Sequence, residues 1–364
     1  MKSLLSLSTL LSLYLFSFFF YAVTGCPPPG SSLMLRDGTI IGEHAEWLRG
    51  ENGTRLTRDE IDKRSMHVIS GKAGFGRLWE GNTAIYCFAG SVSNDDRTIL
   101  RRDLTAAWEL WTTAGIDARI INFREATVEE CEGPRNTYIQ IVVPKKDSLS
   151  SSLGNTGTSR MTLSTNPDMA MGDRVGNYAH EIGHVFGLMH EHQRPEMWST
   201  AYGGTADHNS FIWNCANLAD YAEVLGNADE ETKTRRCQTR DGAAGGLMDS
   251  KSLSATNWLP VPASNVVVAG DFDMTSIMIY ATEAGGYALG GGLRAPVYTL
   301  ANGDLLHYNH APSAGDIAAI NDLYPAPAPD PQPCMLYDAC SPFRTAYEHI
   351  KGCVNCQQQQ GNHC

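Results

Sequence analysis

The chain is short of basic residues and of long hydrophobic runs. Its 364 residues include 28 lysines and arginines against 40 aspartates and glutamates, which gives a formal net charge of −12. Nucleic-acid binding needs a positive surface, so this deficit argues against a nucleic-acid partner. Beyond residue 25 no apolar run is long enough to span a membrane, so we expect the remainder to be a soluble protein.

The first 25 residues are typical of a secretory signal peptide. Lys2 is the one charged side chain, an uncharged run follows it, and Val23, Thr24 and Gly25 supply the small or neutral residues that a cleavage site needs. The alternative is an N-terminal membrane anchor. We expect a secreted, extracellular protein with no membrane anchor once the signal has been removed.

Residues 26–64 are polar and rich in turn-forming residues, and they end in the pair Lys63-Arg64. Processing proteases cut after such pairs, so we predict a removable pro-segment, and hence a zymogen. An irregular N-terminal extension is the alternative. The segment also holds Asn52-Gly53-Thr54, an acceptor triplet for N-glycosylation.

Ten cysteines agree with an oxidising compartment, where disulfides form. Half of them lie in residues 334–364, behind a proline-rich linker at 326–333. We predict a small disulfide module there. A zinc site is the less favoured use of the last Cys and His residues, namely Cys353, Cys356, His363 and Cys364.

The region 65–325 has the patterns of one globular domain. Apolar residues at helical spacing predict helices at 97–115 and 313–325, and β-branched runs predict strands at 118–123 and 137–143. A further strand is expected within 154–164, which makes an α/β outline for the N-terminal half. Residues 197–270 have weak periodicity and predict loops, with Cys215 and Cys237 paired across them.

The stretch "HEIGHVFGLMH", residues 180–190, holds three histidines at a spacing suited to one metal ion. His180 and His184 are one helical turn apart on the same face. His190 reaches the same point only if the helix ends first, because six more residues would rotate it about 240° around the axis. Gly187 supplies the left-handed backbone conformation for that turn.

Zinc in a catalytic site takes three protein ligands and leaves a fourth position for water. Glu181 is adjacent to His180 and is the predicted general base, taking a proton from the zinc-activated water that attacks a peptide bond. Serine and cysteine nucleophiles are disfavoured, because the chain has neither the nucleophile-elbow motif of a catalytic serine nor a sequence signature of a catalytic cysteine. A helix that carries histidines by accident is the alternative.

The pattern H-E-x-x-H-x-x-G-x-x-H resembles that of the metzincins, and its continuation, His190 to Glu196, resembles the astacin family of zinc metalloendopeptidases. The resemblance implies an α+β fold of two subdomains: a mixed sheet and the zinc-binding helix above an irregular C-terminal subdomain. It also implies one catalytic Zn²⁺ held by His180, His184 and His190. Glu191 would meet the new N-terminus of the mature enzyme.

Residues 276–280, "SIMIY", resemble the turn with methionine that lies beneath the metal in this family. Met278 would be the methionine of that turn. Tyr280 would be an extra ligand at rest and would bind the oxyanion during the reaction. A buried core strand is the alternative for this stretch.

The chain departs from the family pattern in several places. Residues 144–179 lack the cysteine of a usual disulfide, Ile279 replaces a histidine, and Met197-Trp198 replaces Arg-Asp. The aspartate motif that blocks the metal in related zymogens is also missing. Glu43 is the nearest counterpart and a possible zymogen switch, with Asp37 as its competitor.

These patterns predict a secreted zinc-dependent endopeptidase whose partners are protein or peptide substrates. A metzincin of another branch is disfavoured by Tyr280, two residues after Met278. An inactive scaffold that binds partners through its Cys-rich tail is the rival from another class. It is disfavoured because Glu181 and all three histidines are present. The sequence predicts no oligomeric state.

Overall fold

The computed structural model describes residues 65–68, 76–205, 210–245 and 251–325, together with the backbone of two short strands at 33–34 and 40–41. All of these except Pro325 lie in the first of two compact units, Met1–Tyr324. The predicted signal peptide, most of the pro-segment including Asp37 and Glu43, the linker and the Cys-rich module lie outside the described residues. Among the helices described, none is both long and apolar enough to cross a membrane.

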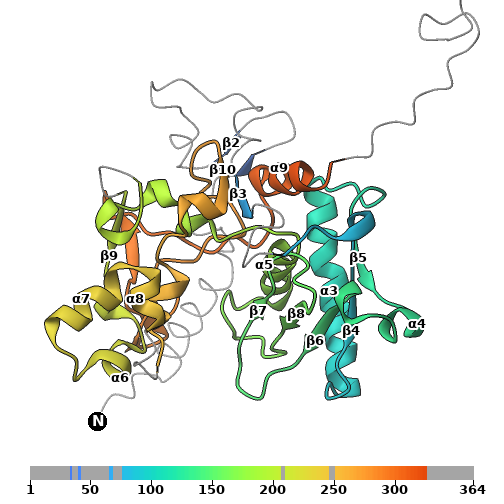
Figure 1. The fold of residues 1–364 in the computed structure, drawn as a ribbon, viewed down its shortest axis with the longest axis horizontal. Helices are drawn as coiled ribbons and strands as arrows, with labels where there is room; N and C mark the ends of the chain where they lie inside the picture. Colours follow the sequence, from blue (N-terminus) through green and yellow to red (C-terminus); the bar gives the residue numbers. More distant parts are fainter. Residues whose placement is uncertain are drawn as a thin grey trace, which may run out of the picture. The chain divides into compact units, whose positions relative to one another are not determined.

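A five-stranded mixed sheet forms the N-terminal half, in the order β5-β4-β6-β8-β7 (Figure 1). β4 pairs in parallel with β5 and β6, and β6 with β8, while the edge strand β7 runs antiparallel to β8. The strands are β4 Thr83–Phe88, β5 Asn122–Glu125, β6 Ile139–Val142, β7 Ser150–Ser151 and β8 Arg160–Thr162.

Two helices pack alongside each other and share one core with this sheet (Figure 1). α3 spans Asn94–Ala114 and α5 spans Arg174–Val185. Trp111 of α3 is fully buried, and its indole N–H donates to the carbonyl of Ala179 in α5 at 3.0 Å. This contact ties α5 to α3 at Ala179, the residue before His180.

The C-terminal half is built from short elements around a second core, which includes Trp198, Phe211 and Tyr298. Strands β9 and β13 pair with each other, as do β11 with β12 and β10 with β3. The elements of this half are β9 Phe211–Trp213, α6 Tyr221–Leu225, α7 Glu230–Gln238, α8 Arg240–Ala244, β10 Val266–Ala269, β11 Ala288–Gly290, β12 Leu293–Arg294 and β13 Tyr298–Leu300. Strand β3, Ser65–Val68, precedes the sheet in the chain and pairs with β10. The helix α9, Ala314–Leu323, packs into the first core.

The predicted fold class, a mixed sheet and helix above an irregular half, is confirmed by these elements. The helices predicted at 97–115 and 313–325 are present as α3 and α9. The strand predicted at 118–123 is wrong in its first half. Asp117 accepts hydrogen bonds from the backbone and side chain of Arg119 and holds a turn there, so the strand begins at Asn122.

Two disulfides lie within the described residues. Cys215 and Cys237 are bonded, as predicted from the sequence. Cys87 and Cys131 form the second bridge, which ties β4 to the short helix α4, Val128–Cys131. The sequence offered no way to choose this pairing among the remaining cysteines.

Candidate metal centre and active site

The structure brings His180, His184 and His190 together at one point. The helix α5 presents the first two and ends at Val185. Gly187 has a φ of 100°, in the left-handed region, and the chain turns back there. One nitrogen from each of the three rings lies within 4.8 Å of the others.

The outer nitrogen of each ring is bound to an oxygen that only accepts hydrogen bonds. His180 Nδ1 is 2.8 Å from the carbonyl of Ile277, His184 Nδ1 is 2.8 Å from the carbonyl of Leu188, and His190 Nδ1 is 3.1 Å from the Gln193 amide oxygen. Each Nδ1 therefore carries the proton. Each Nε2 therefore has a free lone pair that faces the centre. A metal ligand needs this tautomer, with the proton on Nδ1.

The spacing and burial of the Nε2 atoms fit a small cation. The Nε2 atom of His190 is 3.0 Å from that of His184 and 3.2 Å from that of His180. Zn–N bonds of about 2.0–2.1 Å in a tetrahedron would separate the nitrogens by about 3.3 Å. Burial lowers the pKa of His180 to about 4 and that of His184 to about 3, so both rings are neutral at pH 7.

Glu181 lies on α5 between the two helical histidines and is 5% exposed. Its burial raises the pKa of its carboxyl group to about 7, and the hydroxyl of Ser151 opposes that shift. The Ser151 Oγ is 2.7 Å from the Oε2 atom of Glu181. A carboxyl group with a pKa near neutrality can both take and return a proton.

Met278 packs beneath the helix that carries the histidines. It is 1% exposed, and Gly183 leaves the space for it: a Cβ atom at position 183 would lie 2.5 Å from the Met278 sulfur. The next turn places Tyr280 beside the triad, with its ring centroid 4.4 Å from that of His190. Within the described part of the chain the Tyr280 hydroxyl has no hydrogen-bond partner.

His192 was not predicted as a site residue, yet it is fully buried beside the triad. Its ring stacks on Tyr280 with centroids 4.6 Å apart, and its Nδ1 accepts the Tyr280 backbone N–H at 3.2 Å. Its Nε2 donates to the carbonyl of Asn257 at 2.9 Å, so it points away from the centre. The repeated histidine in "HEH" was the only signal for it.

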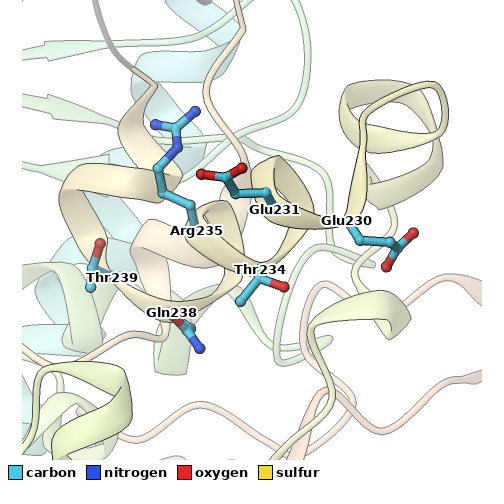
Figure 2. A pocket seen from close by; sticks show the side chains of 6 residues that line it. All are labelled: Glu230, Glu231, Thr234, Arg235, Gln238 and Thr239. Carbon is cyan, nitrogen blue, oxygen red and sulfur yellow. The ribbon is translucent and has the colours of Figure 1, made fainter.

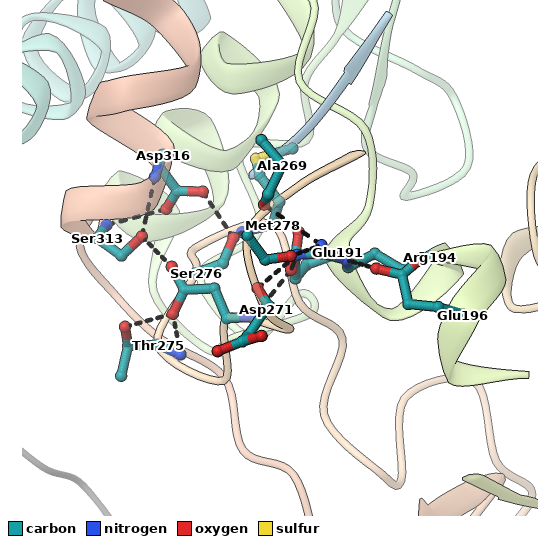
Figure 3. Close-up of polar contacts among 12 residues, drawn as sticks. Glu191, Arg194, Glu196, Ala269, Asp271, Thr275, Ser276, Met278, Ser313 and Asp316 are labelled. Atoms are coloured by element: carbon teal, nitrogen blue, oxygen red, sulfur yellow. Dashed lines mark hydrogen bonds and ion pairs between the residues drawn. The ribbon is translucent and has the colours of Figure 1, made fainter. Parts of the chain in front are cut away.

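Glu191 belongs to a buried polar network (Figure 3). Its Oε1 accepts from Arg194 Nη1 at 2.7 Å and from the backbone N–H of Asp273 at 2.8 Å. Arg194 is fully buried and also donates to the carbonyls of Ala269 and Asp271. The network thus joins the residue after the third histidine to strand β10 and to the turn that precedes Met278.

An open depression of about 440 Å³ lies elsewhere, on α7 and the residue that follows it (Figure 2). None of the site residues line it; the lining residues are Glu230, Glu231, Thr234, Arg235, Gln238 and Thr239.

Three histidine nitrogens around one point, with a buried glutamate on the same helix, define the class of a metal-dependent hydrolase. The family model described as Astacin, a peptidase family, matches residues 72–199, which include all four of these side chains. This match agrees with the predicted resemblance to the astacin family of zinc metalloendopeptidases. The match ends before Met278 and Tyr280.

One curated relative is bone morphogenetic protein 1 of Xenopus laevis, 27% identical over 158 residues. The aligned part is 43% of this chain and spans only 20% of that protein's length.

Two solved structures are similar to this chain. One is high choriolytic enzyme 1, a hatching enzyme zinc-protease from Oryzias latipes (medaka fish). It is 17% identical to this chain, and the alignment covers 71% of this chain and 98% of the enzyme's chain, with a TM-score of 0.43. The other is myroilysin, which is 18% identical to this chain. That alignment covers 69% of this chain and 97% of the myroilysin chain, with a TM-score of 0.42.

Proposed function

We propose that this protein is a secreted zinc-dependent endopeptidase that cleaves protein or peptide substrates and is made as a zymogen. One observation carries the proposal: three imidazoles, those of His180 and His184 buried and that of His190 partly exposed, each hold their proton on Nδ1 and turn unprotonated Nε2 atoms to one point beside Glu181. The two disulfides among the described residues are compatible with secretion.

His180, His184 and His190 would hold the zinc ion. Bound there, zinc lowers the pKa of water towards about 7 and polarises a carbonyl group. The neutral rings need no deprotonation at pH 7, and their Nδ1 hydrogen bonds to fixed acceptors set their orientation.

Glu181 would be the general base and then the general acid. It takes the proton of the water that attacks the peptide carbonyl, and it returns a proton to the leaving amine. Burial raises the pKa of this carboxyl group, which favours its accepting the proton. No covalent intermediate with the protein is required.

Tyr280 would stabilise the oxyanion that forms on the substrate. Its hydroxyl is free of other partners in the described residues, and its ring packs against those of His190 and His192. Burial also raises the pKa of this phenol, so it keeps its proton and can donate it as a hydrogen bond.

Maturation would occur after Arg64. Strand β3 begins at the next residue, Ser65, and pairs with β10 so that Ser65 lies opposite Ala269. The Ala269 carbonyl accepts from Arg194, which binds Glu191. A new N-terminus at Ser65 would therefore lie in the strand next to the Glu191 network, which supports the role inferred for Glu191.

The residues that follow Ser65 in β3 are part of the folded domain. Met66 is 2% exposed and packs with Met189, and His67 bridges to Leu188 in the loop between the second and third histidines. These contacts favour a mature domain that begins near residue 65. Latency through Glu43, or through its competitor Asp37, remains our proposal for the segment that is removed.

The test of this function is Glu181→Gln in the zinc-loaded mature protein. The amide keeps the size of the side chain but has no basic oxygen. We expect cleavage of a denatured protein or a peptide library to fall at least 1,000-fold, near the upper range for general base catalysis, with zinc content unchanged. Glu109→Gln, an exposed change on α3, is the matched control.

Peptide cleavage by Glu181→Gln at the wild-type rate would refute the mechanism. A wild-type protein that binds zinc and cleaves no peptide or protein would favour the rival, an inactive scaffold that binds partners.

A further inference from the structure

Ser151 is the one side chain that hydrogen-bonds the carboxylate of Glu181 in the described part of the chain. Its Oγ lies 2.7 Å from Glu181 Oε2 and 3.0 Å from the Glu181 backbone carbonyl. A serine hydroxyl has a single hydrogen, and both of these oxygens accept. The shorter contact is to the carboxylate, whose negative charge makes it the stronger acceptor.

The strand that carries Ser151 gives it this direction. β7 consists of Ser150 and Ser151 and forms the edge of the sheet, with Ser151 opposite Met161 of β8. Side chains alternate between the two faces of a strand, so Ser150 is exposed where Ser151 is turned towards α5. The hydroxyl of Ser152, the next residue, accepts the backbone N–H of Arg160 instead.

The contact leaves the two carboxylate oxygens of Glu181 in different situations. Oε2 is held by Ser151, whereas Oε1 has no hydrogen-bond partner among the residues that the structure describes. An isolated carboxylate rotates easily about its last side-chain bond. One fixed oxygen therefore defines where the other one points.

We propose that Ser151 is a positioning residue for Glu181: by holding Oε2, it orients Oε1 towards the water whose proton Glu181 accepts. This inference rests on the proposed function, because it concerns the same general base. Its consequence is that the edge strand of the sheet, and not only the helix α5, determines the geometry of the base. Among the described residues the Ser151 hydroxyl hydrogen-bonds Glu181 and none of the zinc ligands, and on this account it does not touch the reacting atoms.

The experiment compares Ser151→Ala, Ser151→Thr and Ser150→Ala in the full zinc-loaded protein after maturation. Ser150→Ala is the matched control, since it removes the same hydroxyl from the neighbouring residue of the same strand. We expect Ser151→Ala to lower kcat about tenfold with KM and zinc content unchanged, because one hydrogen bond to a charged group is lost. Ser151→Thr keeps a hydroxyl and should restore kcat to within about threefold of wild type.

Four results would overturn the proposal. They are an unchanged kcat in Ser151→Ala, an equal loss in Ser150→Ala, a loss that appears only in KM, and a loss that follows reduced zinc content or a lower Tm. The KM result would assign Ser151 to substrate binding at the sheet edge.

Crystal structures of the zinc-loaded wild type and Ser151→Ala give a second reading that does not depend on activity. We expect a single orientation of the Glu181 carboxylate in the wild type and a rotated or divided one in the variant. The same single orientation of the carboxylate in the wild type and in Ser151→Ala would refute the proposal, even if the wild type cleaved no peptide. Absence of cleavage by the wild type, with the carboxylate displaced in the variant, would count against the proposed function alone.

Discussion

Tyr280 shows how one residue can be held firmly and still keep its functional group free. Its backbone N–H is bound by His192, its backbone carbonyl accepts the hydroxyl of Tyr298 at 2.5 Å, and its ring packs on His190 and His192. The phenol oxygen alone is left unbound in the described residues. Such an arrangement suits a group that acts on the substrate and not on the fold.

Tyr280→Phe should therefore affect the reaction and spare the structure. The ring contacts remain in phenylalanine, so we expect Tm and zinc content to stay within error of wild type. One oxyanion donor is typically worth about 3 kcal/mol, so kcat should fall about 100-fold while KM changes little. Steady-state kinetics on a fluorogenic peptide will measure this. An unchanged kcat would mean that Tyr280 only packs against the histidines.

At the scale of elements, the terminal helix α9 is tied to the turn beneath the metal centre (Figure 3). Asp316 forms a capping box with Ser313 at the start of α9, and its carboxylate also accepts the Ser276 hydroxyl at 2.6 Å and the Ile277 backbone N–H at 2.9 Å. The carbonyl of Ile277 in turn accepts from His180. A residue near the end of the domain thus supports the first histidine through the backbone of one residue, Ile277.

Asp316→Asn should make the stability of the protein less dependent on pH. Burial, and then the charge of nearby Asp273, raise the Asp316 pKa from 3.8 to about 6. Because the folded pKa is the higher one, the stability that Asp316 contributes is fully present below pH 3.8 and is lost as the pH rises through about 6. Asparagine stays neutral throughout and can still accept from the Ile277 and Ser313 N–H groups.

Urea unfolding of both zinc-free proteins at pH 4.5 and pH 7.5 measures this effect. The stability of wild type relative to Asp316→Asn should be lower at pH 7.5 than at pH 4.5 by about 2 kcal/mol, at about 1.4 kcal/mol per pKa unit. A relative stability that rises with pH would show that the three hydrogen bonds outweigh burial and keep the carboxylate ionised in the fold.

The sequence predicted the elements that have strong local patterns and missed those that depend on distant partners. The helix α3 has apolar residues at regular spacing and a glycine stop, and α5 carries the histidine motif. β7 could not be predicted, because two serines have no hydrophobic alternation and become a strand only by pairing with β8. The link from Ser151 to Glu181 was invisible for the same reason.

The polar network around Glu191 has a similar origin. The spacing of residues 180–190 was enough to predict which histidines converge, since helical geometry fixes it locally. Glu191 accepts hydrogen bonds from Arg194, which is near in sequence, and from Asp273, which is 82 residues away. Nothing in a local pattern relates position 191 to position 273, so that part of the site required the folded chain.

At the scale of the whole molecule, the metal centre is where the two halves meet. The helix α5, which packs into the first core, supplies two histidines. The turn with Met278 and Tyr280 comes from the second half of the chain. Met278 packs on Gly183 inside the histidine helix. An ion held at this point would therefore stabilise both halves together and not only one loop.

Reconstitution with zinc tests the central claim most directly. The mature protein is stripped with a chelator, dialysed and titrated with Zn²⁺, while cleavage of a peptide substrate and Tm are followed together. His184→Ala serves as the control with a broken triad. We predict that cleavage is absent without the metal, returns in proportion to about one equivalent of zinc with a parallel rise in Tm, and does not return in His184→Ala. Full cleavage by the stripped protein, or equal recovery in His184→Ala, would contradict the account.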